Sequence, residues 1–199
     1  MSVPSHGQCK WNARYAAADA GAGEAAWVLR EYAHLLPTPT QGQGQALDLA
    51  CGLGANALYL AGRGLQVSAW DGSAQAIARL QTEAQARGLT LTAAVRDVVE
   101  QPPEPASLDV IVVAHFLERR LFPALIAALR PGGLLFYQTF TTQRVEGQST
   151  PSNPDFLLAP NELLELCQPL RILAYREDGL AGNLTQGMRA RAACVGMQR

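Results

Sequence analysis

The sequence predicts a doubly wound α/β fold, with a mostly parallel seven-stranded sheet and one antiparallel strand near the edge of that sheet. Short apolar segments alternate five times along the chain with segments of helical periodicity. Residues 108–114 (LDVIVVA) are continuously apolar and rich in β-branched side chains, which is typical of a central parallel strand buried on both faces. Two further strand-like segments end the chain without a helix between them, which indicates an antiparallel pair.

Composition restricts the class of protein. Of 199 residues, 48% are hydrophobic and 17% charged, a balance that favours a folded chain over a disordered one. A net charge of −1 disfavours a protein that neutralises nucleic-acid phosphates. No apolar run is long enough to cross a bilayer, and residues 1–10 lack the apolar core of a secretory signal. We therefore expect a cytoplasmic protein, monomeric or homodimeric, with no nucleic-acid or membrane partner.

The cysteines and histidines do not predict a metal site. The four cysteines are far apart in sequence, without a Cys-x-x-Cys pair, and the three histidines are not clustered. Neither a disulfide framework nor a zinc site is therefore expected.

The N-terminal half of the chain is expected to alternate strands and helices after an initial helical cap. We expect a single domain over residues 1–199, in which 1–44 form the cap with a Pro- and Gly-rich linker and 45–199 form the core. Ser73 precedes an apolar-periodic segment as an N-cap should, and Gly88 follows that segment as a helix stop. The expected elements are helices over 11–34 with a break at 21–23, strands over 46–50 and 65–70, and helices over 56–63 and 73–87.

The C-terminal half continues the alternation and contains one long irregular stretch. Residues 141–160 hold three prolines and an apolar patch, Phe156 to Leu158, so we expect them to close as a lid over a small acceptor; a surface loop without such a role is the alternative. Asn161 is placed to cap the helix that follows them. The expected strands span 89–95, 108–114, 134–140, 170–175 and 189–195, and the expected helices span 121–130 (stopped by Pro131-Gly132-Gly133) and 161–167.

The most informative segment runs from Ala46 to Ala57 (ALDLACGLGANA) as strand, Gly-x-Gly turn and helix. Glycines let the backbone approach a ligand, and the helix start offers free amide donors. Gly52, Gly54 and Ala57 also satisfy the G-x-G-x-x-G/A pattern, and Asp71 lies 19 residues after Gly52. The core is therefore expected to be Rossmann-like and to bind a nucleotide-like ligand.

Asp48 lies within the apolar strand, where a dinucleotide site usually has another apolar residue. A buried carboxylate is costly unless it is paired with a positive charge or with several donors. Asp48 could simply tie down the loop. A ligand that carries an ammonium group, such as S-adenosylmethionine, explains its position better.

Several segments together resemble class I S-adenosylmethionine-dependent methyltransferases. Residues 47–54 (LDLACGLG) look like motif I of that family, and Arg130-Pro131-Gly132-Gly133 looks like the turn before its fifth strand. Three further segments are similar to other family motifs: 11–15 (WNARY), 70–73 (WDGS) and 96–98 (RDV). Within the family, residues 48–60 (DLACGLGANALYL) and 151–158 (PSNPDFLL) resemble the tellurite-resistance methyltransferase group.

The resemblance implies cofactor contacts residue by residue. Gly52 and Gly54 would pass close to the methionine moiety, with Asp48 and Ala50 near its amino group. Asp71 would accept from the ribose hydroxyls and Asp97 from the adenine amino group. The complete implied set for S-adenosylmethionine, and for its product S-adenosylhomocysteine, is Arg14, Tyr15, Asp48, Ala50, Cys51, Gly52, Gly54, Asn56, Asp71, Gly72, Ser73, Ile77, Asp97, Val98, Ala114, His115 and Phe116.

Methyl transfer depends mainly on the placement of the acceptor, so few catalytic side chains are expected. His115, at the end of the fourth strand, is the candidate base, and Arg119 is the second candidate catalytic residue; either could instead be structural. With Arg120 and Arg144, Arg119 would suit a small soft or anionic acceptor such as a thiol or a metalloid oxyanion. Two alternatives stay open: an NAD(P)-dependent oxidoreductase, and a non-catalytic module that binds S-adenosylmethionine.

Overall fold

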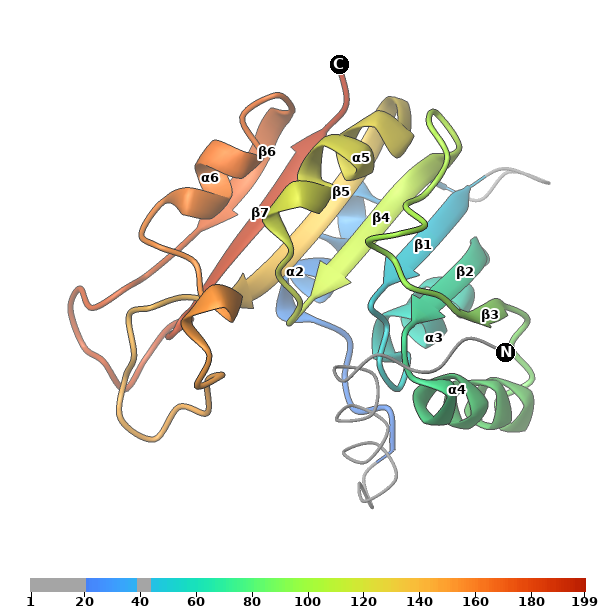
Figure 1. Cartoon of the computed structure of the whole chain (residues 1–199), viewed down its shortest axis with the longest axis horizontal. Helices are drawn as coiled ribbons and strands as arrows, with labels where there is room; N and C mark the ends of the chain where they lie inside the picture. Colours follow the sequence, from blue (N-terminus) through green and yellow to red (C-terminus); the bar gives the residue numbers. More distant parts are fainter. Residues whose placement is uncertain (1–20, 39–43) are drawn as a thin grey trace.

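The computed structural model describes residues 21–38 and 44–199. Its centre is one seven-stranded sheet with the strand order β3-β2-β1-β4-β5-β7-β6 (Figure 1). β7 pairs antiparallel with β5 and with β6, while the other pairings are parallel, which confirms the predicted sheet. The strands are β1 (Gln45–Leu49), β2 (Gln66–Asp71), β3 (Thr92–Val95), β4 (Leu108–Ala114), β5 (Leu129–Phe140), β6 (Arg171–Arg176) and β7 (Arg191–Met197).

Helices cover both faces of the sheet. Side chains of α2, α3 and α4 join one apolar cluster with one face, and those of α5 and α6 join a second cluster with the opposite face. This three-layer arrangement buries both faces of the parallel strands, as their apolar sequences require. The helices are α2 (Trp27–Glu31), α3 (Ala55–Ala61), α4 (Ala74–Ala86), α5 (Phe122–Ala128) and α6 (Glu162–Leu166), with short 3-10 turns η1 (Ala33–Leu35), η2 (Arg119–Leu121) and η3 (Pro154–Phe156).

Three local predictions are confirmed in detail. β4 has the predicted bounds, and its residues 110–113 have no exposed surface. At the start of α4, the Ser73 hydroxyl accepts a hydrogen bond from the Ala76 N–H at 3.2 Å, as an N-cap does. Gly88 follows α4 with a φ of 65°, the left-handed conformation that ends a helix.

The Pro-Gly-Gly segment differs from the prediction, because α5 ends at Ala128 and residues 131–133 lie within β5. Leu129 already pairs with Leu108, and sheet pairing extends the strand backwards through the segment predicted to be helical. Gly133 is required here for space: a Cβ atom would lie 2.9 Å from the Arg130 carbonyl oxygen and 3.1 Å from that of Leu108.

The prediction of an Asn161 side-chain cap is wrong. Asn161 precedes α6 with a φ of 65°, and its side chain makes no capping hydrogen bond. Its backbone N–H instead donates to Glu177 Oε2 at 3.0 Å, so a contact with the chain after β6 fixes the start of the helix.

The apolar patch of the long loop is also not available as predicted. Thr141 and Leu158 form an isolated parallel bridge, which turns the segment back against the sheet. Leu157 and Leu158 are 4% and 0% exposed, so both belong to the protein interior, while Phe156 is 42% exposed. An apolar closure over an acceptor could therefore use Phe156 alone of these three side chains.

Gly133 generates a stability prediction. Replacing Gly133 with Ala should lower the free energy of unfolding by about 1–3 kcal/mol, because the new methyl group meets two backbone oxygens that cannot move freely. Urea unfolding followed by circular dichroism measures the change. Gly21→Ala is the matched control, since a Cβ atom at Gly21 meets nothing within 4 Å. Equal stability of the two variants would contradict the steric account.

Candidate functional site

The candidate site lies where β1 and β4 end side by side. The helices that follow these strands, α3 and α5, join clusters on opposite faces of the sheet, so β1 and β4 flank the point where the direction of winding reverses. Open α/β sheets bind ligands in the crevice at that point. Ala50 and His115 directly follow the two strands with φ values of 54° and 57°. Such strained non-glycine residues concentrate at functional sites.

The glycine loop between β1 and α3 is shaped by close packing. Gly54 precedes α3 with a φ of 79°, and a Cβ atom at this position would lie 2.3 Å from a methyl group of Leu80. No larger residue could therefore start α3 this close to α4. The Cys51 N–H donates to the Trp70 carbonyl oxygen at 2.9 Å, which joins the loop to β2. Cys51 itself is buried, and burial raises the pKa of its thiol.

Asp48 is 1% exposed and serves as the hub of a buried hydrogen-bond network. Its Oδ2 accepts from the Ala57 N–H at 2.9 Å, and its Oδ1 accepts from the Asn56 side-chain amide at 3.2 Å. The Asn56 Oδ1 in turn accepts from the Ala26 N–H at 2.8 Å. Burial raises the pKa of Asp48 to about 7, with a smaller contribution from Asp71, although these hydrogen bonds lower it. The described contacts of Asp48 thus tie down the loop, and its role beside an amino group stays a prediction.

Asp71 connects the glycine loop to the turn after β2. Its Oδ2 accepts from the Gly52 N–H and its Oδ1 from the Ser73 N–H, both at 2.8 Å. The side chain is 8% exposed, and burial raises its pKa in spite of the two hydrogen bonds. Each carboxylate oxygen can accept more than one hydrogen bond, so both retain capacity for ligand hydroxyl groups. Gly72 lies in the turn between Asp71 and Ser73.

Asp97 follows β3 and presents an exposed carboxylate. Its Oδ1 accepts from the Val99 and Glu100 N–H groups at 3.1 and 3.3 Å. The preceding residue, Arg96, stacks its guanidinium 3.8 Å from the centre of the Trp70 ring and donates to the Gln101 carbonyl oxygen at 2.8 Å. This stacking fixes the turn that carries Asp97, a role that the sequence does not indicate. The apolar residues expected around the adenine, Ile77 and Val98, are both buried.

His115 directly follows β4, which lies next to β1 on the side opposite β2. Its backbone N–H donates to the Gln138 carbonyl oxygen at 2.9 Å, and its ring stacks on Phe140 with a centroid distance of 5.1 Å. The residue keeps substantial exposed surface, yet close packing around the ring lowers its pKa, and the positive charge of Arg191 lowers it further. His115 is therefore neutral at neutral pH and can accept a proton.

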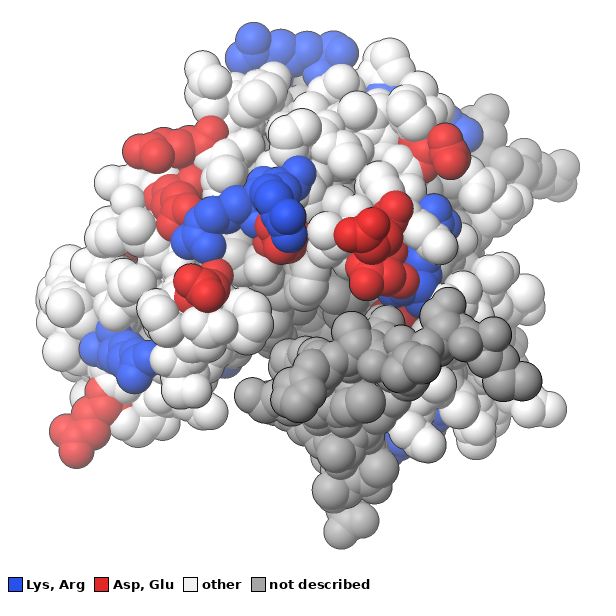
Figure 2. Space-filling view, in the orientation of Figure 1, with Lys and Arg blue, Asp and Glu red and all other residues white. Residues whose placement is uncertain are grey.

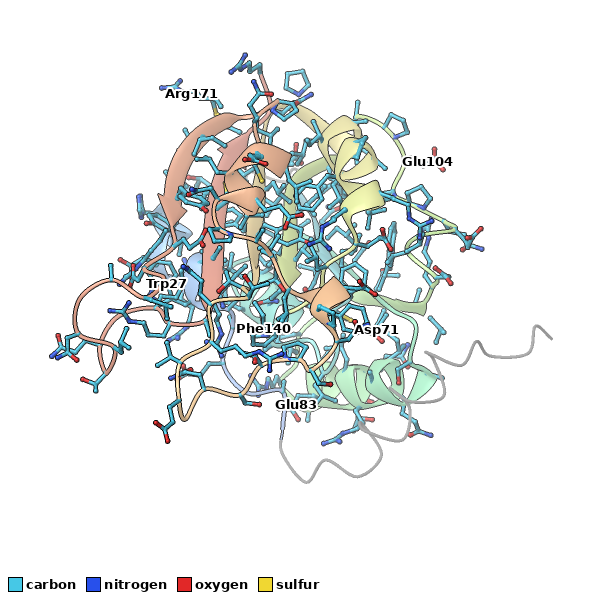
Figure 3. The ribbon with its side chains drawn as sticks, turned by 60° about the vertical axis from the view of Figure 1, so that its left-hand side comes forward. Trp27, Asp71, Glu83, Glu104, Phe140 and Arg171 are labelled. Carbon is cyan, nitrogen blue, oxygen red and sulfur yellow. The ribbon has the colours of Figure 1, made fainter. Side chains whose placement is uncertain are left out.

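Two neighbours of His115 line the same strand end. Ala114 pairs with Gln138 at the end of β4, and the Phe116 carbonyl oxygen accepts from the Tyr137 hydroxyl at 2.9 Å. Figure 3 shows that Asp71 and Phe140 lie at the same end of the sheet.

The predicted catalytic role of Arg119 is not supported. Arg119 pairs with Glu162 and also donates to the Asp155 and Leu157 carbonyl oxygens, each at 2.9 Å. Its guanidinium therefore holds the segment between β5 and α6 against η2. The sequence could not reveal this role, because Glu162 lies 43 positions away.

The other two arginines predicted near the acceptor are also engaged elsewhere. Arg120 pairs with Glu118, and Arg144 donates to the Pro151 carbonyl oxygen at 3.1 Å. Figure 2 shows basic and acidic side chains interspersed over this face, without a continuous basic patch. The sequence missed instead Phe140 and Arg191, which antiparallel pairing of β5 with β7 brings together.

Arg14 and Tyr15 lie outside the described residues. Within residues 21–38 and 44–199, no group of three or more His, Cys, Asp or Glu side chains could hold a metal ion. No helix in the same described part of the chain is both long and apolar enough to span a membrane.

Comparisons with known proteins agree on one family. Residues 46–133 match the methyltransferase domain family. A probable S-adenosyl-L-methionine-dependent methyltransferase, TehB of Haemophilus influenzae, is 31% identical over 142 residues, which are 67% of this chain and 48% of TehB. The chain thus spans about half the length of the curated relatives it matches.

Solved structures share the fold. The crystal structure of TehB from Haemophilus influenzae matches with a TM-score of 0.69 at 24% identity, over 88% of this chain and 63% of that one. The geranyl diphosphate C-methyltransferase of Streptomyces coelicolor, solved with Mg²⁺, geranyl diphosphate and S-adenosyl-L-homocysteine, matches with a TM-score of 0.67 at 13% identity, over 85% and 76%. These findings confirm the predicted methyltransferase class and leave the NAD(P)-dependent alternative without support.

Arg119 generates a prediction that separates structure from catalysis. Arg119→Gln should lower the free energy of unfolding by about 1 kcal/mol, since partly exposed charged hydrogen bonds are lost, and should leave cofactor affinity unchanged. Urea unfolding and calorimetry with S-adenosylhomocysteine measure the two quantities. Arg120→Gln, which removes a 79% exposed side chain, is the control and should change neither. Unaltered stability of Arg119→Gln would refute the structural role.

Proposed function

Because residues 46–133 form a class I S-adenosylmethionine-dependent methyltransferase domain, we propose that this protein transfers a methyl group from that cofactor to a small-molecule acceptor. The observation that carries the proposal is the Asp71 carboxylate, which is bonded to the glycine loop through the Gly52 N–H at the carboxyl edge of the sheet. An acid at this place suits the ribose hydroxyls of a nucleoside cofactor, because it accepts hydrogen bonds and excludes phosphate by charge.

The residues present fit S-adenosylmethionine. Asp71 would hold the ribose, and the exposed Asp97 carboxylate would accept from the adenine amino group beside Val98 and Ile77. Asp48 would stabilise the amino group through the loop that it organises, together with Ala50. Gly52 and Gly54 would let the backbone pass close to the methionine moiety. Cys51, Asn56, Gly72, Ser73, Ala114, His115 and Phe116 complete the proposed cofactor site.

In the proposed reaction, the protein has to position the acceptor and to remove a proton from it where it carries one. S-adenosylmethionine supplies a methyl group on a sulfonium sulfur, which keeps the electron pair of the broken carbon–sulfur bond. The acceptor atom would supply the electron pair of the new bond to that carbon. Where the acceptor is a protonated thiol, the neutral His115 ring would take its proton and pass it to water. Holding the acceptor about 3–3.5 Å from the methyl carbon accounts for much of the acceleration.

The acceptor class is the finer part of the proposal. We propose a small thiol or a metalloid oxyanion, because residues 48–60 and 151–158 resemble the tellurite-resistance methyltransferase group. A cytoplasmic location and a monomeric or homodimeric state stay predictions.

Turnover tests the proposed function directly. Purified protein is incubated with S-adenosylmethionine and a panel of small thiols, selenite and tellurite, and S-adenosylhomocysteine formation is followed by mass spectrometry. Product formation that depends on an acceptor supports the proposal. Tight binding of S-adenosylhomocysteine without turnover on any acceptor would support the non-catalytic alternative, and absence of binding would refute both.

Asp71 and Asp97, the acids proposed to bind the ribose and the adenine, should contribute differently to cofactor affinity. Asp71→Ala should weaken S-adenosylhomocysteine binding by about 1.5–3 kcal/mol, since it removes charged hydrogen bonds. Asp97→Ala should cost less, because one exposed contact is lost. Calorimetry measures both. The control is Asp109→Ala, which removes an acid whose Oδ2 accepts from the Gln45 N–H and from Arg130 at the opposite end of the strands. Affinity unchanged in Asp71→Ala would place the ribose elsewhere.

Asp48 predicts that cofactor affinity depends on pH. Its pKa of about 7 without ligand should fall when the ammonium group of the cofactor stabilises the carboxylate. Affinity for S-adenosylhomocysteine should therefore be highest above about pH 7, where Asp48 is already ionised. It should decrease as the pH falls below that value, because binding must then release the proton of Asp48. Calorimetry from about pH 8 to about pH 6, in buffers of different ionisation enthalpy, measures affinity and proton release. Constant affinity without proton release would contradict an electrostatic effect of the ammonium group on the Asp48 carboxylate.

A further inference from the structure

An aromatic surface with a cation over it lies beside the candidate base. Phe140 ends β5, His115 stacks on its ring, and the Arg191 guanidinium carbon lies 5.5 Å from the centre of the same ring. Arg191 reaches this place because β7 runs antiparallel, so that its first residue pairs with the last residue of β5. We refer to these three residues as the β5–β7 corner.

Arg191 differs from the arginines around it in its partners. Arg119, Arg120 and Arg176 each form an ion pair with a carboxylate. Within the described part of the chain, no carboxylate lies within ion-pair distance of Arg191, and its one ring contact is with Phe140. A partly exposed guanidinium held over a ring keeps its N–H edge available for an anion.

From this geometry we propose that Arg191 binds an anionic group of the methyl acceptor, while His115 faces the nucleophilic atom of the same molecule. The proposal rests on the proposed methyl transfer and adds the substrate class: a small acceptor with a carboxylate or an oxyanion close to its nucleophile. Phe140 positions both side chains by stacking. Arg191 is a specificity-determining residue in this account, and His115 is the group that accepts the proton.

The electrostatics of the corner favour this division of roles. The charge of Arg191 contributes to the lowered pKa of His115, so the two side chains interact electrostatically. An anion bound at Arg191 would offset that charge and raise the pKa of His115, which makes the ring a better proton acceptor when the acceptor molecule is present. Neutral acceptors would gain neither the contact nor this effect.

Kinetics with two thiols of similar size test the proposal. Mercaptoacetate carries a carboxylate, and 2-mercaptoethanol is neutral. Arg191→Gln should raise the KM for mercaptoacetate roughly tenfold or more, because a charged hydrogen bond is lost, and should leave the KM for 2-mercaptoethanol and the affinity for S-adenosylhomocysteine unchanged. Arg171→Gln is the matched control: it removes the same charge at the far end of β6 (Figure 3) and should alter no parameter.

An NMR titration provides a readout that does not require turnover. The His115 resonance, assigned with His115→Gln, should titrate at higher pH in Arg191→Gln than in the wild type. Mercaptoacetate, added to protein loaded with S-adenosylhomocysteine, should raise the pKa of His115 in the wild type only.

The outcomes separate the two proposals. Failure of the wild type to bind S-adenosylhomocysteine would refute the proposed function, and a titration of the unloaded protein with mercaptoacetate would then still decide whether the corner binds an anion. Normal turnover with equal effects of Arg191→Gln on both thiols would overturn the inference alone. A His115 resonance that mercaptoacetate does not shift in the wild type would also overturn it.

Discussion

The rest of the site depends on the hydrogen bonds of the buried Asp48 carboxylate. Removing a carboxylate from water is costly, and the cost is offset here by donors from two positions of α3. One of them, Asn56, passes the constraint on to the Ala26 N–H, just before α2. Gln138 of β5 accepts from the Val28 N–H at 3.1 Å in the same helix start. Hydrogen bonds of Asp48, Asn56 and Gln138 thus connect β1, α3, β5 and the start of α2.

Local patterns predicted those parts of the fold that depend on local physics. The apolar run of β4, the Ser73 cap and the acids at the ends of β1, β2 and β3 follow from burial, capping and chain direction, and each is visible within a few residues of sequence. The boundary between α5 and β5 was misplaced because pairing of Leu129 with Leu108 outweighs the local helical pattern. Propensity decides such boundaries only where no neighbouring strand is available.

The roles of individual polar side chains were predictable only where the partner is near in sequence. Asp48 was expected to need donors, yet whether Asn56 or a ligand supplies them depends on the turn into α3. Arg119 was assigned to the acceptor because η2 follows β4, whereas Glu162 and two carbonyl groups bind its guanidinium from the other side. The sequence did not predict a role for Arg191, because its position at the site depends on the antiparallel register of β7 with β5.

Charge divides the site into two halves that suit two different molecules. Asp48, Asp71 and Asp97 lie at the ends of β1, β2 and β3, and they give that half a negative character suited to a cofactor with ammonium and sulfonium groups. At the end of β4, His115 is kept neutral, and at the start of β7 Arg191 supplies the positive charge. An anionic acceptor would be repelled from the first half and attracted to the second, so the same charges that bind each molecule also keep it from the wrong place. The strained backbone at Ala50 and His115 lies at the two strand ends where the proposed cofactor and acceptor sites meet.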